Sequence, residues 1–505
     1  MQYRTSLNQP TAIMSIAGFV TFAARTVAVC FLVSGMVLPG LAASAAESLF
    51  LPAGAVEQAP ALQAGQKRAR IAQFNAQLLE VQSPLRRTGL AAAASGSRDI
   101  TLNLFADKSY AVRIDRIESK NAGRFTAWGH VPGVPQSQII LSVCDGEVAG
   151  AIHIPGENPC QIFPQGNGRQ QVIELDPASV PQCGSGDIVV PGGAIPVGAG
   201  PAPAADGGNV VVDVMVVYTS AARTGAGGVA GINSSIDLAV AEANTTFANS
   251  GVNITLRLVY GGEVTYTETG TASTDLDRLR ISNDGYLDTV HALRTQYGAD
   301  LVCLLVENMA TYAGLGYVMS PVSSGFSSYA FTVVKRMYAS GYYVFAHELG
   351  HNMGCQHNLE DAGSAGAYPY SYGHRFNTGG TDYRTVMSYG NTYMRIPHFS
   401  NPEVSYLGTS TGVATNLPNP ANNALGLNNA AATVAAFASS VPMIAFDGAG
   451  SGFDFDAVTT NVLESGGTVP QRPRLRACAG HVAHDGIAIA TADGGWTACD
   501  LHGFC

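Results

Sequence analysis

The residues best suited to chemistry form one short stretch, HELGHNMGCQH, at residues 347–357. It fits the pattern H-E-x-x-H-x-x-G-x-x-H at every specified position. In a helix, His347 and His351 would lie one turn apart on one face, where both imidazoles can reach one Zn²⁺ at about 2.0–2.1 Å. Gly354 can adopt the left-handed turn that ends such a helix, and the reversed chain would bring His357 in as third ligand. The fourth position stays open, as in catalytic zinc sites.

Glu348 follows the first of these histidines without sharing their face. A carboxylate there can take a proton from zinc-bound water and pass it to the leaving amine. A structural zinc site does not need that carboxylate and usually fills all four positions with protein ligands. The alternative is an amphipathic helix with buried histidines, which would require three histidines to converge by accident. The pattern therefore predicts zinc-assisted hydrolysis with Glu348 as general base.

This stretch resembles the zinc-binding block of the metzincin metallopeptidases. Residues 385–389, Thr-Val-Met-Ser-Tyr, are similar to the Met-turn of that group. The resemblance implies that Met387 forms an apolar floor beneath the three imidazoles. It also implies that Tyr389 stands beside the metal, where its hydroxyl can stabilise an oxyanion. The alternatives are a methionine that only fills the core and a packed aromatic ring.

Within the metzincins, residues 209–440 most resemble the bacterial peptidyl-Asp metalloendopeptidases. The segments that carry the similarity are VVVDVMVVYTSAAR, LDTVHALRTQYGADLVCLLVE, FAHELGHNMG and RIPHFSNPEV. The resemblance implies a secreted endopeptidase that cuts on the amino side of Asp. Asn358 departs from the pattern, because related sequences often place Asp after the third ligand; the amide keeps the shape but removes a charge. A broad-specificity metzincin is the alternative enzyme.

A preference for Asp requires a cation in the pocket that receives the carboxylate, because an unpaired buried carboxylate is costly. Arg395 follows the predicted Met-turn and Arg384 precedes it, so both are candidates. Either could instead be an ordinary surface arginine. Asp206 is the single acidic residue of a flexible Pro/Gly/Ala stretch at residues 191–208. We therefore expect self-processing between Ala205 and Asp206.

Cys183 lies in Pro-Gln-Cys-Gly, which is similar to the cysteine-switch segment of matrix metalloproteinase prosegments. The resemblance implies that its thiolate could occupy the open zinc position and keep a precursor latent. The arginine of that motif is replaced by Gln here, and a disulfide from Cys183 to Cys144 or Cys160 is an equal alternative. Export would permit disulfides, and the first pairs to test are Cys144–Cys160 and Cys303–Cys355.

The apolar patterns around the zinc stretch predict an α/β arrangement. The expected strands lie at 210–218, 252–260, 299–306 and, at the sheet edge, 313–319. The expected helices lie at 229–249, 275–297, 341–353 and 428–439. Together with the resemblance, this predicts an α/β (α+β) metzincin catalytic domain with a twisted mixed sheet and a zinc helix. An extended peptide would pair with the edge strand near residues 313–316.

The rest of the chain divides by composition. Residues 1–45 read as a signal peptide, with an apolar run before Ala-Ser-Ala; an uncleaved anchor is the alternative, and Met14 could be the true start. Residues 46–190 read as a β-rich propeptide, with a hairpin at an Asp-Gly turn. Residues 191–208 form a linker, 209–440 the catalytic domain, and 441–505 an extension whose start resembles a Calx-β module.

Composition narrows the class of partner. The chain has 505 residues, 46% of them hydrophobic and 13% charged, with a formal net charge of −10, which suits an exported globular enzyme. Nucleic acid and anionic membranes both require a basic surface, so neither is an expected partner once the signal is removed. Protein or peptide substrates are expected instead. A non-catalytic, zinc-stabilised secreted binding protein is the alternative outside the enzymes, and Glu348 argues against it.

Overall fold

The computed structural model describes residues 47–51, 61–75, 78, 98–121, 123–184 and 208–438, with the backbone of 486–490 and 496–500. The predicted signal peptide, most of the linker and most of the extension fall outside these residues. Within the described part of the chain, no helix combines the length and apolar character needed to cross a bilayer. Near the end of the chain, β21 (Gly486–Ala490) and β22 (Trp496–Asp500) pair as an antiparallel hairpin.

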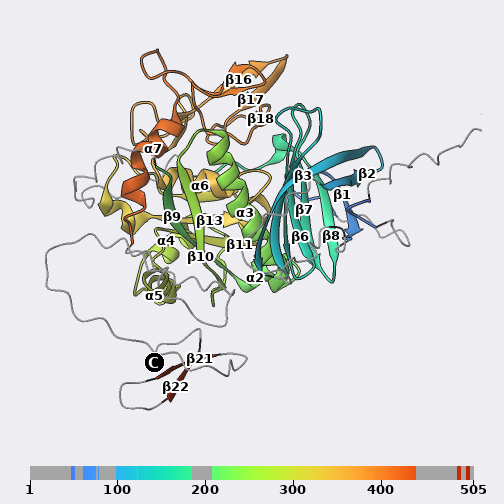
Figure 1. Ribbon diagram of the computed structural model, residues 1–505. Coiled ribbons are helices and arrows are strands. Elements are labelled where there is room, and N and C mark those ends of the chain that lie inside the picture. Colours follow the sequence, from blue (N-terminus) through green and yellow to red (C-terminus); the bar gives the residue numbers. More distant parts are fainter. Residues whose placement is uncertain are drawn as a thin grey trace, which may run out of the picture. The chain divides into compact units, whose positions relative to one another are not determined.

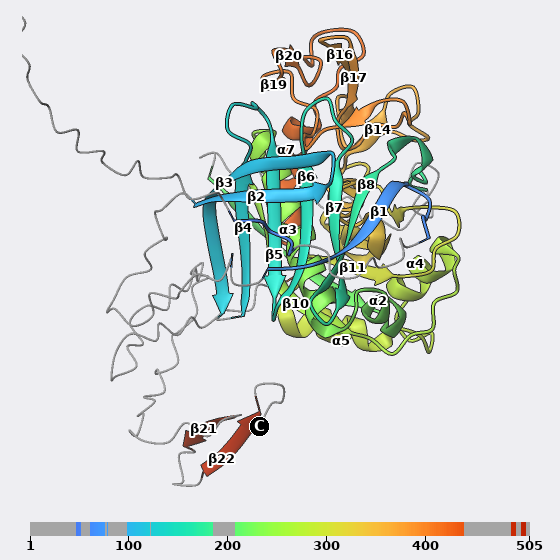
Figure 2. The same ribbon diagram turned by 90° about the vertical axis from the view of Figure 1, so that its right-hand side faces the viewer.

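An eight-stranded antiparallel sheet, which we call the N-terminal sheet, confirms that the region before the linker is β-rich. Its strands are β1 (Gln66–Gln73), β2 (Arg98–Phe105), β3 (Lys108–Asn121), β4 (Arg124–His130), β5 (Gln138–Cys144), β6 (Glu147–His153), β7 (Cys160–Gly166) and β8 (Arg169–Leu175). They lie in the order β1-β8-β7-β6-β5-β4-β3-β2 (Figure 2). The predicted hairpin joins β5 to β6 through Asp145 and Gly146, both with positive φ, as such a turn requires.

A five-stranded mixed sheet forms the centre of the region that follows, residues 208–438, which we call the metallopeptidase region. Its strands are β9 (Val210–Tyr218), β10 (Ile254–Glu263), β11 (Leu301–Val306), β12 (Gly314–Gly316) and β13 (Phe331–Lys335). Their order is β10-β9-β11-β13-β12, and all neighbours are parallel except β12, which runs antiparallel at the edge. The mixed sheet and its edge strand confirm the predicted fold class.

Helices cover this sheet: α2 (Ser220–Gly225), α3 (Val229–Asn249), α4 (Ala272–Arg280), α5 (Asp288–Tyr297), α6 (Val344–Asn352) and α7 (Asn423–Val434). The single helix predicted at 275–297 is wrong, because a turn separates α4 from α5. The carboxylate of Asp288 accepts hydrogen bonds from the backbone N–H groups of Asn283, Asp284 and Gly285 at 2.6, 3.2 and 3.1 Å, which holds that turn. The last helix begins earlier than predicted because Asn422 caps it through the Leu425 N–H.

Helix α3 lies between the two sheets, as Figures 1 and 2 both show. Along β5, Ile139 is buried in the core of the N-terminal sheet, whereas the adjacent Ile140 packs against Leu238 and Ala241 of α3. The opposite side of α3 packs into the core of the mixed sheet, for example through Ile236. One helix therefore supports both sheets.

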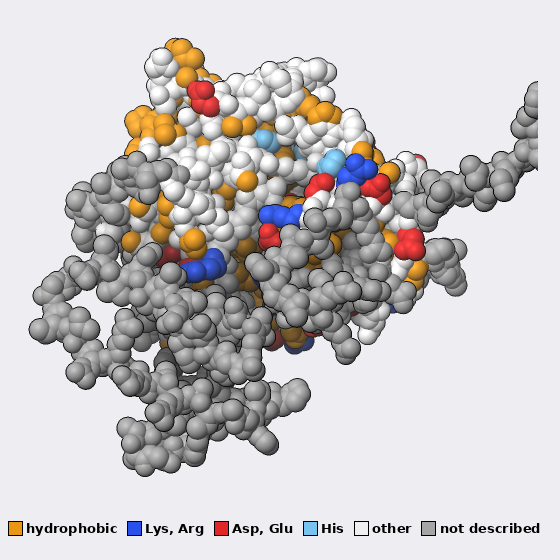
Figure 3. Space-filling view, in the orientation of Figure 1, with side chains coloured by type: hydrophobic (Ala, Val, Ile, Leu, Met, Phe, Trp, Pro, Cys, Tyr) orange, Lys and Arg blue, Asp and Glu red, His pale blue; other side chains and the backbone are white. Residues whose placement is uncertain are grey.

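Short elements complete the metallopeptidase region. They are η3 (Ser324–Tyr329), η4 (Arg336–Tyr338), β14 (Gln356–Asn358), β15 (Tyr372–Gly373), β16 (Arg375–Thr378), β17 (Thr381–Arg384), β18 (Met394–Arg395), β19 (Ser405–Tyr406) and β20 (Thr409–Ser410). A further short helix, η1 (Pro177–Ser179), follows the N-terminal sheet. On the face drawn in Figure 3, the described residues form no large basic area.

The two suggested disulfides, Cys144–Cys160 and Cys303–Cys355, are not formed, and all four residues carry buried free thiols. Cys144 ends β5 and Cys160 begins β7, so a whole strand, β6, lies between them. Strands two positions apart are separated by about 9.6 Å, which exceeds the reach of a disulfide. The thiol of Cys355 instead lies 3.9 Å from the Asn423 carbonyl oxygen.

Candidate metal centre

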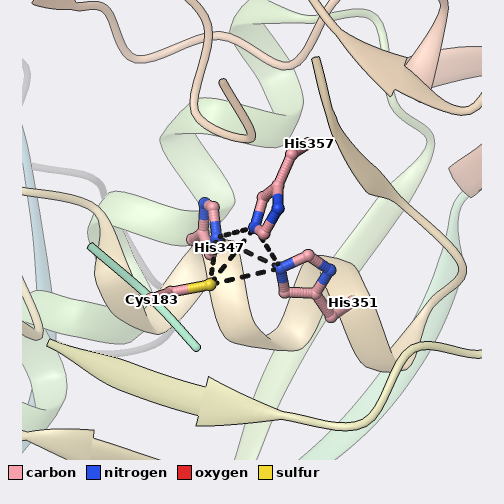
Figure 4. A group of neighbouring side chains, drawn as sticks. All are labelled: Cys183, His347, His351 and His357. Atoms are coloured by element: carbon pink, nitrogen blue, oxygen red, sulfur yellow. Dashed lines mark hydrogen bonds between the residues drawn. The ribbon is translucent and has the colours of Figure 1, made fainter. Parts of the chain in front are cut away.

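Three imidazoles converge from α6 and from β14. His347 and His351 lie one turn apart on α6, and His357 belongs to β14. Their Nε2 atoms are 3.1 Å (His347 to His351), 3.0 Å (His351 to His357) and 3.3 Å (His347 to His357) apart (Figure 4). Nitrogens at about 2.0–2.1 Å from a tetrahedral Zn²⁺ would lie about 3.4 Å apart, so the three atoms fit around one ion.

Hydrogen bonds from the second ring nitrogen orient two of these imidazoles. Nδ1 of His347 lies 2.8 Å from the Val386 carbonyl oxygen, and Nδ1 of His351 lies 2.9 Å from the Cys355 carbonyl oxygen. Because a carbonyl only accepts, each Nδ1 carries the proton and each Nε2 keeps its lone pair for a metal. Burial lowers the pKa of all three imidazoles, that of His351 to about 4, which favours the neutral, metal-binding form.

The chain reverses at Gly354, as the sequence predicts. This residue has φ +94°, and its N–H donates to the His351 carbonyl at 3.0 Å. A side chain here would also collide with Ala367, so both conformation and space require glycine. The reversal carries the chain back along α6 and brings His357 to the other two histidines.

Met387 is fully buried and packs against α6. An added Cβ at Gly350, on α6, would come within 2.8 Å of the methionine sulfur, so this glycine makes room for it. Arg384 stabilises the turn through two hydrogen bonds. Its Nη1 donates to the Ser388 carbonyl at 2.6 Å, and its Nε donates to the Tyr393 carbonyl at 3.2 Å. Arg384 is thus committed to the backbone of the turn.

Asn358 links the third histidine to Tyr389. Its side-chain oxygen accepts a hydrogen bond from the Tyr389 N–H at 2.9 Å. Its amide nitrogen donates to Glu360 at 2.7 Å and to Asp361 at 2.8 Å. An Asp at position 358 would face two carboxylates, so the amide suits this chain's own surroundings. Sequence reasoning missed the acidic pair, although it follows Asn358 almost directly.

Glu348 is fully buried between α6 and the edge strand β12. A Cβ added at Gly314 would stand 2.6 Å from Glu348 Oε1, and one at Gly316 would stand 3.4 Å from Oε2. The two glycines of β12 therefore provide the space for the carboxylate. Sequence reasoning placed an edge strand here but did not recognise why it contains glycine at alternate positions.

Cys183 reaches the same centre from the end of the N-terminal region. Its Sγ lies 3.0 Å from His347 Nε2, 3.2 Å from His357 Nε2 and 3.5 Å from His351 Nε2, as the dashed lines in Figure 4 mark. A thiolate and an imidazole on one tetrahedral Zn²⁺ would place S and N about 3.6 Å apart. Cys183 therefore occupies the place of a fourth ligand, and it is not bridged to Cys144 or Cys160.

The backbone around Cys183 pairs with the edge strand. The Gly184 N–H donates to the Gly314 carbonyl at 3.2 Å, and the Ala313 N–H donates to the Gln182 carbonyl at 3.1 Å. The Tyr389 hydroxyl donates to the carbonyl oxygen of Cys183 at 2.6 Å. We call residues 181–184 the Cys183 segment; its backbone is hydrogen-bonded both to residues 313–314 and to the Tyr389 hydroxyl.

Arg395 lies in β18 and is partly exposed. Its Nη1 donates to the Tyr342 carbonyl at 2.7 Å, while its buried Nε has no hydrogen-bond partner among the described residues. Burial lowers the pKa of this guanidinium, and the nearby Cys183, Tyr389 and Glu348 act in the opposite direction. The side chain is thus a cation close to the metal centre with a donor to spare.

This fold and site define a metallopeptidase. Residues 209–400 match the family model Reprolysin_5, described as metallo-peptidase family M12. The chain belongs to the M12 family of metallopeptidases.

Its similar relatives are named peptidyl-Asp metalloendopeptidase. One from Stenotrophomonas maltophilia is 36% identical over 314 residues, which span 60% of this chain and 71% of that protein. One from Xanthomonas campestris pv. campestris is 36% identical over 313 residues, 60% of this chain and 70% of that protein. One from Pseudomonas fragi is 30% identical over 167 residues, 33% of this chain and 85% of that protein.

Solved structures give a weaker comparison. Metalloproteinase-II from Bacteroides fragilis matches with a TM-score of 0.32 at 11% identity, covering 54% of this chain and 86% of that chain. A TM-score this low does not establish a shared fold or function.

Proposed function

We propose that this chain is the latent precursor of a secreted zinc endopeptidase that cuts on the amino side of Asp. The observation that supports the proposal most is the cluster of Cys183, His347, His351 and His357, whose ligand atoms lie within 4.8 Å of one another. Neutral imidazoles and a thiolate are ligands that suit Zn²⁺. The fourth ligand comes from a separate segment, so its removal would open the position that catalysis requires.

The residues around the cluster have distinct proposed roles. Zinc bound there would polarise the scissile carbonyl and lower the pKa of the attacking water. Glu348 is the proposed base, taking the proton of that water and returning it to the leaving amine. The Tyr389 hydroxyl, which now donates to the Cys183 carbonyl, would donate to the oxyanion of the substrate in its place.

The substrate backbone would replace the Cys183 segment. Gly314 and Ala313 already offer a carbonyl and an N–H to the segment, and an extended peptide can use the same groups. This pairing would hold the scissile carbonyl next to the three histidines and Glu348. Because a thiolate on the metal and a peptide on β12 exclude one another, the same contacts support latency.

Arg395 is the proposed partner of the Asp side chain. Its buried Nε has no acceptor among the described residues, and the residue as a whole is partly exposed. Charge-assisted hydrogen bonds from a guanidinium to a carboxylate are among the stronger polar contacts in proteins. Arg384, the other candidate, has its donors on the carbonyls of Ser388 and Tyr393, so we assign specificity to Arg395 alone. The names of the relatives support the preference for Asp.

The experiment that tests the function is digestion of casein and of a peptide library by the purified Cys183→Ser protein, whose fourth metal position the thiol can no longer fill, with and without a metal chelator. Chelator-sensitive cleavage with Asp enriched after the cut is the expected result. Cleavage without that enrichment would indicate a broad-specificity metzincin. No cleavage by the zinc-loaded Cys183→Ser protein would indicate a non-catalytic zinc protein and would overturn the proposal. Sequencing of the mature N-terminus tests the predicted cut between Ala205 and Asp206.

A further inference from the structure

The surface of α3 that faces the N-terminal sheet contains a buried apolar cluster. Leu238 and Ala241 of α3 form one buried cluster with Ile140, Ala149 and Ala151 of β5 and β6. The Trp128 side chain of β4 borders this cluster and its Nε1–H donates to the Thr245 hydroxyl at 3.2 Å. Such a contact is built like a protein core rather than like a transient domain interface.

The N-terminal sheet also contributes directly to the core of the metallopeptidase region. Phe163, Ile173, Leu175 and Val180 belong to the same buried cluster as the mixed sheet. At Gly227, the backbone of the metallopeptidase region approaches strand β7 so closely that a Cβ would collide with it. The two parts therefore share one continuous core.

A buried charge is neutralised across this contact. Asp237 of α3 has a side chain only 1% exposed. Arg124 donates to its two oxygens at 2.5 and 2.8 Å, and Lys120 donates at 2.5 Å. Both cations come from β3 and β4, so the N-terminal sheet supplies the partners that make burial of this carboxylate tolerable.

Residues of the N-terminal part of the chain also bind the loop that leads into α6. The Tyr338 hydroxyl donates to the Ala64 carbonyl at 2.9 Å, and the Tyr342 hydroxyl donates to the Gly65 carbonyl. The Gln161 side chain donates to the Ser340 carbonyl. These contacts hold the residues that precede α6, the helix of His347 and His351, and do not involve the linker.

We propose that α3 and the loop at residues 338–342 form a docking surface that retains the N-terminal sheet non-covalently after the 191–208 linker is cut. Val180 is buried in the shared core and Cys183 follows three residues later. A docked sheet thus keeps the thiol beside the histidines at an effective concentration on the order of millimolar or higher. Cutting the linker alone leaves the metal centre closed, and opening it requires a second cut between Val180 and Cys183 or dissociation of the sheet. The second half of this proposal rests on the proposed latency.

The test uses the full chain with a recognition sequence for a highly specific protease placed within residues 191–208. After cleavage, the two fragments are run on gel filtration without denaturant, and peptide hydrolysis is measured on the same sample. The expected result is one peak at the volume of the uncut chain, with hydrolysis raised less than about twofold. Two separated fragments would overturn the docking surface. One peak with full hydrolysis would overturn the retention of Cys183 at the metal.

Charge-reversal variants test whether the ion pairs of Asp237 with Arg124 and Lys120 hold the two fragments together. Asp237→Arg should separate the fragments after cleavage, because it faces Arg124 and Lys120. Combining it with Arg124→Glu and Lys120→Glu should restore the single peak, which a simple folding failure would not allow. Asp99→Lys, at an exposed ion pair within the N-terminal sheet, is the matched control and should leave the single peak unchanged. If reversed charges at Asp237 and at Asp99 have the same effect, the assigned contact is wrong.

Failure of the enzyme assignment is separable from failure of docking. The elution volume reports docking whether or not the protein hydrolyses peptides. A cut Cys183→Ser chain that elutes as one peak yet never hydrolyses peptides with zinc present would refute the proposed function and leave the docking surface standing.

Discussion

The two sides of the metal centre are built differently. On one side, His347, His351 and Met387 are almost fully buried, and the hydrogen bond from His347 Nδ1 to the Val386 carbonyl oxygen ties α6 to the turn at Met387. On the other side, Cys183 belongs to a partly exposed segment that pairs with β12 through two backbone hydrogen bonds. The first side can keep its geometry when the second leaves. We call α6 and the turn at Met387 the buried wall of the site, and the Cys183 segment its cover. A latent hydrolase requires a preorganised wall and a cover that can leave.

The largest expected effect comes from the buried wall. Glu348→Gln should retain about one zinc per chain and lose about 10²- to 10⁴-fold of hydrolysis, because the base is not among the metal ligands. His351→Ala should lose both metal and hydrolysis, because it removes a ligand. Zinc content by atomic absorption and turnover of a peptide substrate, both measured in chains that also carry Cys183→Ser so that the fourth position is open, show whether metal binding and hydrolysis separate.

Glu348→Gln is the matched variant because it changes the carboxylate with almost no change in volume. A Glu348→Gln protein that hydrolyses peptides at nearly the wild-type rate would contradict the proposed mechanism. Loss of zinc from this variant would instead show that Glu348 contributes to metal binding.

A smaller effect of opposite sign is expected at the Cys183 segment, where a substitution should raise hydrolysis instead of lowering it. Cys183→Ser in the uncleaved chain should raise hydrolysis about tenfold or more, because a neutral hydroxyl is a far poorer zinc ligand than a thiolate. Alkylation of Cys183 should act in the same direction. Cys144→Ser, at a buried thiol of the N-terminal sheet, is the control and should leave the precursor latent. A disulfide at Cys183 in the intact secreted precursor would refute the latency mechanism.

The wall was far easier to predict from the sequence than its cover. Three ligands and the base lie within eleven residues, and helical spacing alone brings two of the ligands together. Cys183 is 164 residues before His347, so a flanking motif could suggest its role but could not exclude a disulfide. The space that Gly314 and Gly316 leave for Glu348 depends on tertiary packing, which no local pattern encodes.

The same reasoning explains the errors of secondary structure. The apolar spacing of residues 275–297 fits one helix, but three backbone N–H groups turn toward the carboxylate of Asp288 and interrupt it. This local competition by a side chain is stronger than the periodicity that predicted the helix. The suggested Cys144–Cys160 disulfide is wrong because β6 separates β5 from β7 in the sheet, a strand order that the spacing of cysteines does not reveal.

Specificity should be affected less than turnover. Arg395→Ala should reduce the preference for Asp after the cut by about 10- to 100-fold, the value of a charge-assisted hydrogen bond of about 1.5–3 kcal/mol. Hydrolysis of substrates without Asp at that position should change little. A peptide library profiled with wild type and Arg395→Ala gives both quantities.

Arg384→Ala is the comparison for this prediction. Because its donors bind the carbonyls of Ser388 and Tyr393, its loss should lower the melting temperature of the protein without a selective loss of Asp preference. An unchanged Asp preference in Arg395→Ala would remove Arg395 from the proposed pocket.

The last expected effect is the pH dependence of docking, which two buried histidines should set. His153 of β6 lies 2.9 Å (Nε2 to hydroxyl) from Tyr406 of β19, whose ring also contacts His398. Tyr383 packs on the other side of Tyr406. Burial lowers the pKa of His153 to about 3, with a further contribution from His398, and burial lowers the pKa of His398 to about 4. Both imidazoles are therefore neutral in the docked state.

The difference in proton binding between the docked and separated states sets the direction in which pH changes docking. Undocking would return His153 toward its ordinary pKa near 6.5, so the separated state binds more protons as the pH falls below that value. Docking should be full above pH 6.5 and should weaken by at most about 1.4 kcal/mol per pH unit for each histidine below it. Elution of the linker-cut protein between pH 7 and pH 4.5 measures this loss directly. His153→Gln should flatten the dependence, whereas His130→Gln, at an exposed ion pair with Asp115 in the same sheet, should leave it unchanged. Equal pH profiles for wild type and His153→Gln would show that this cluster does not govern docking.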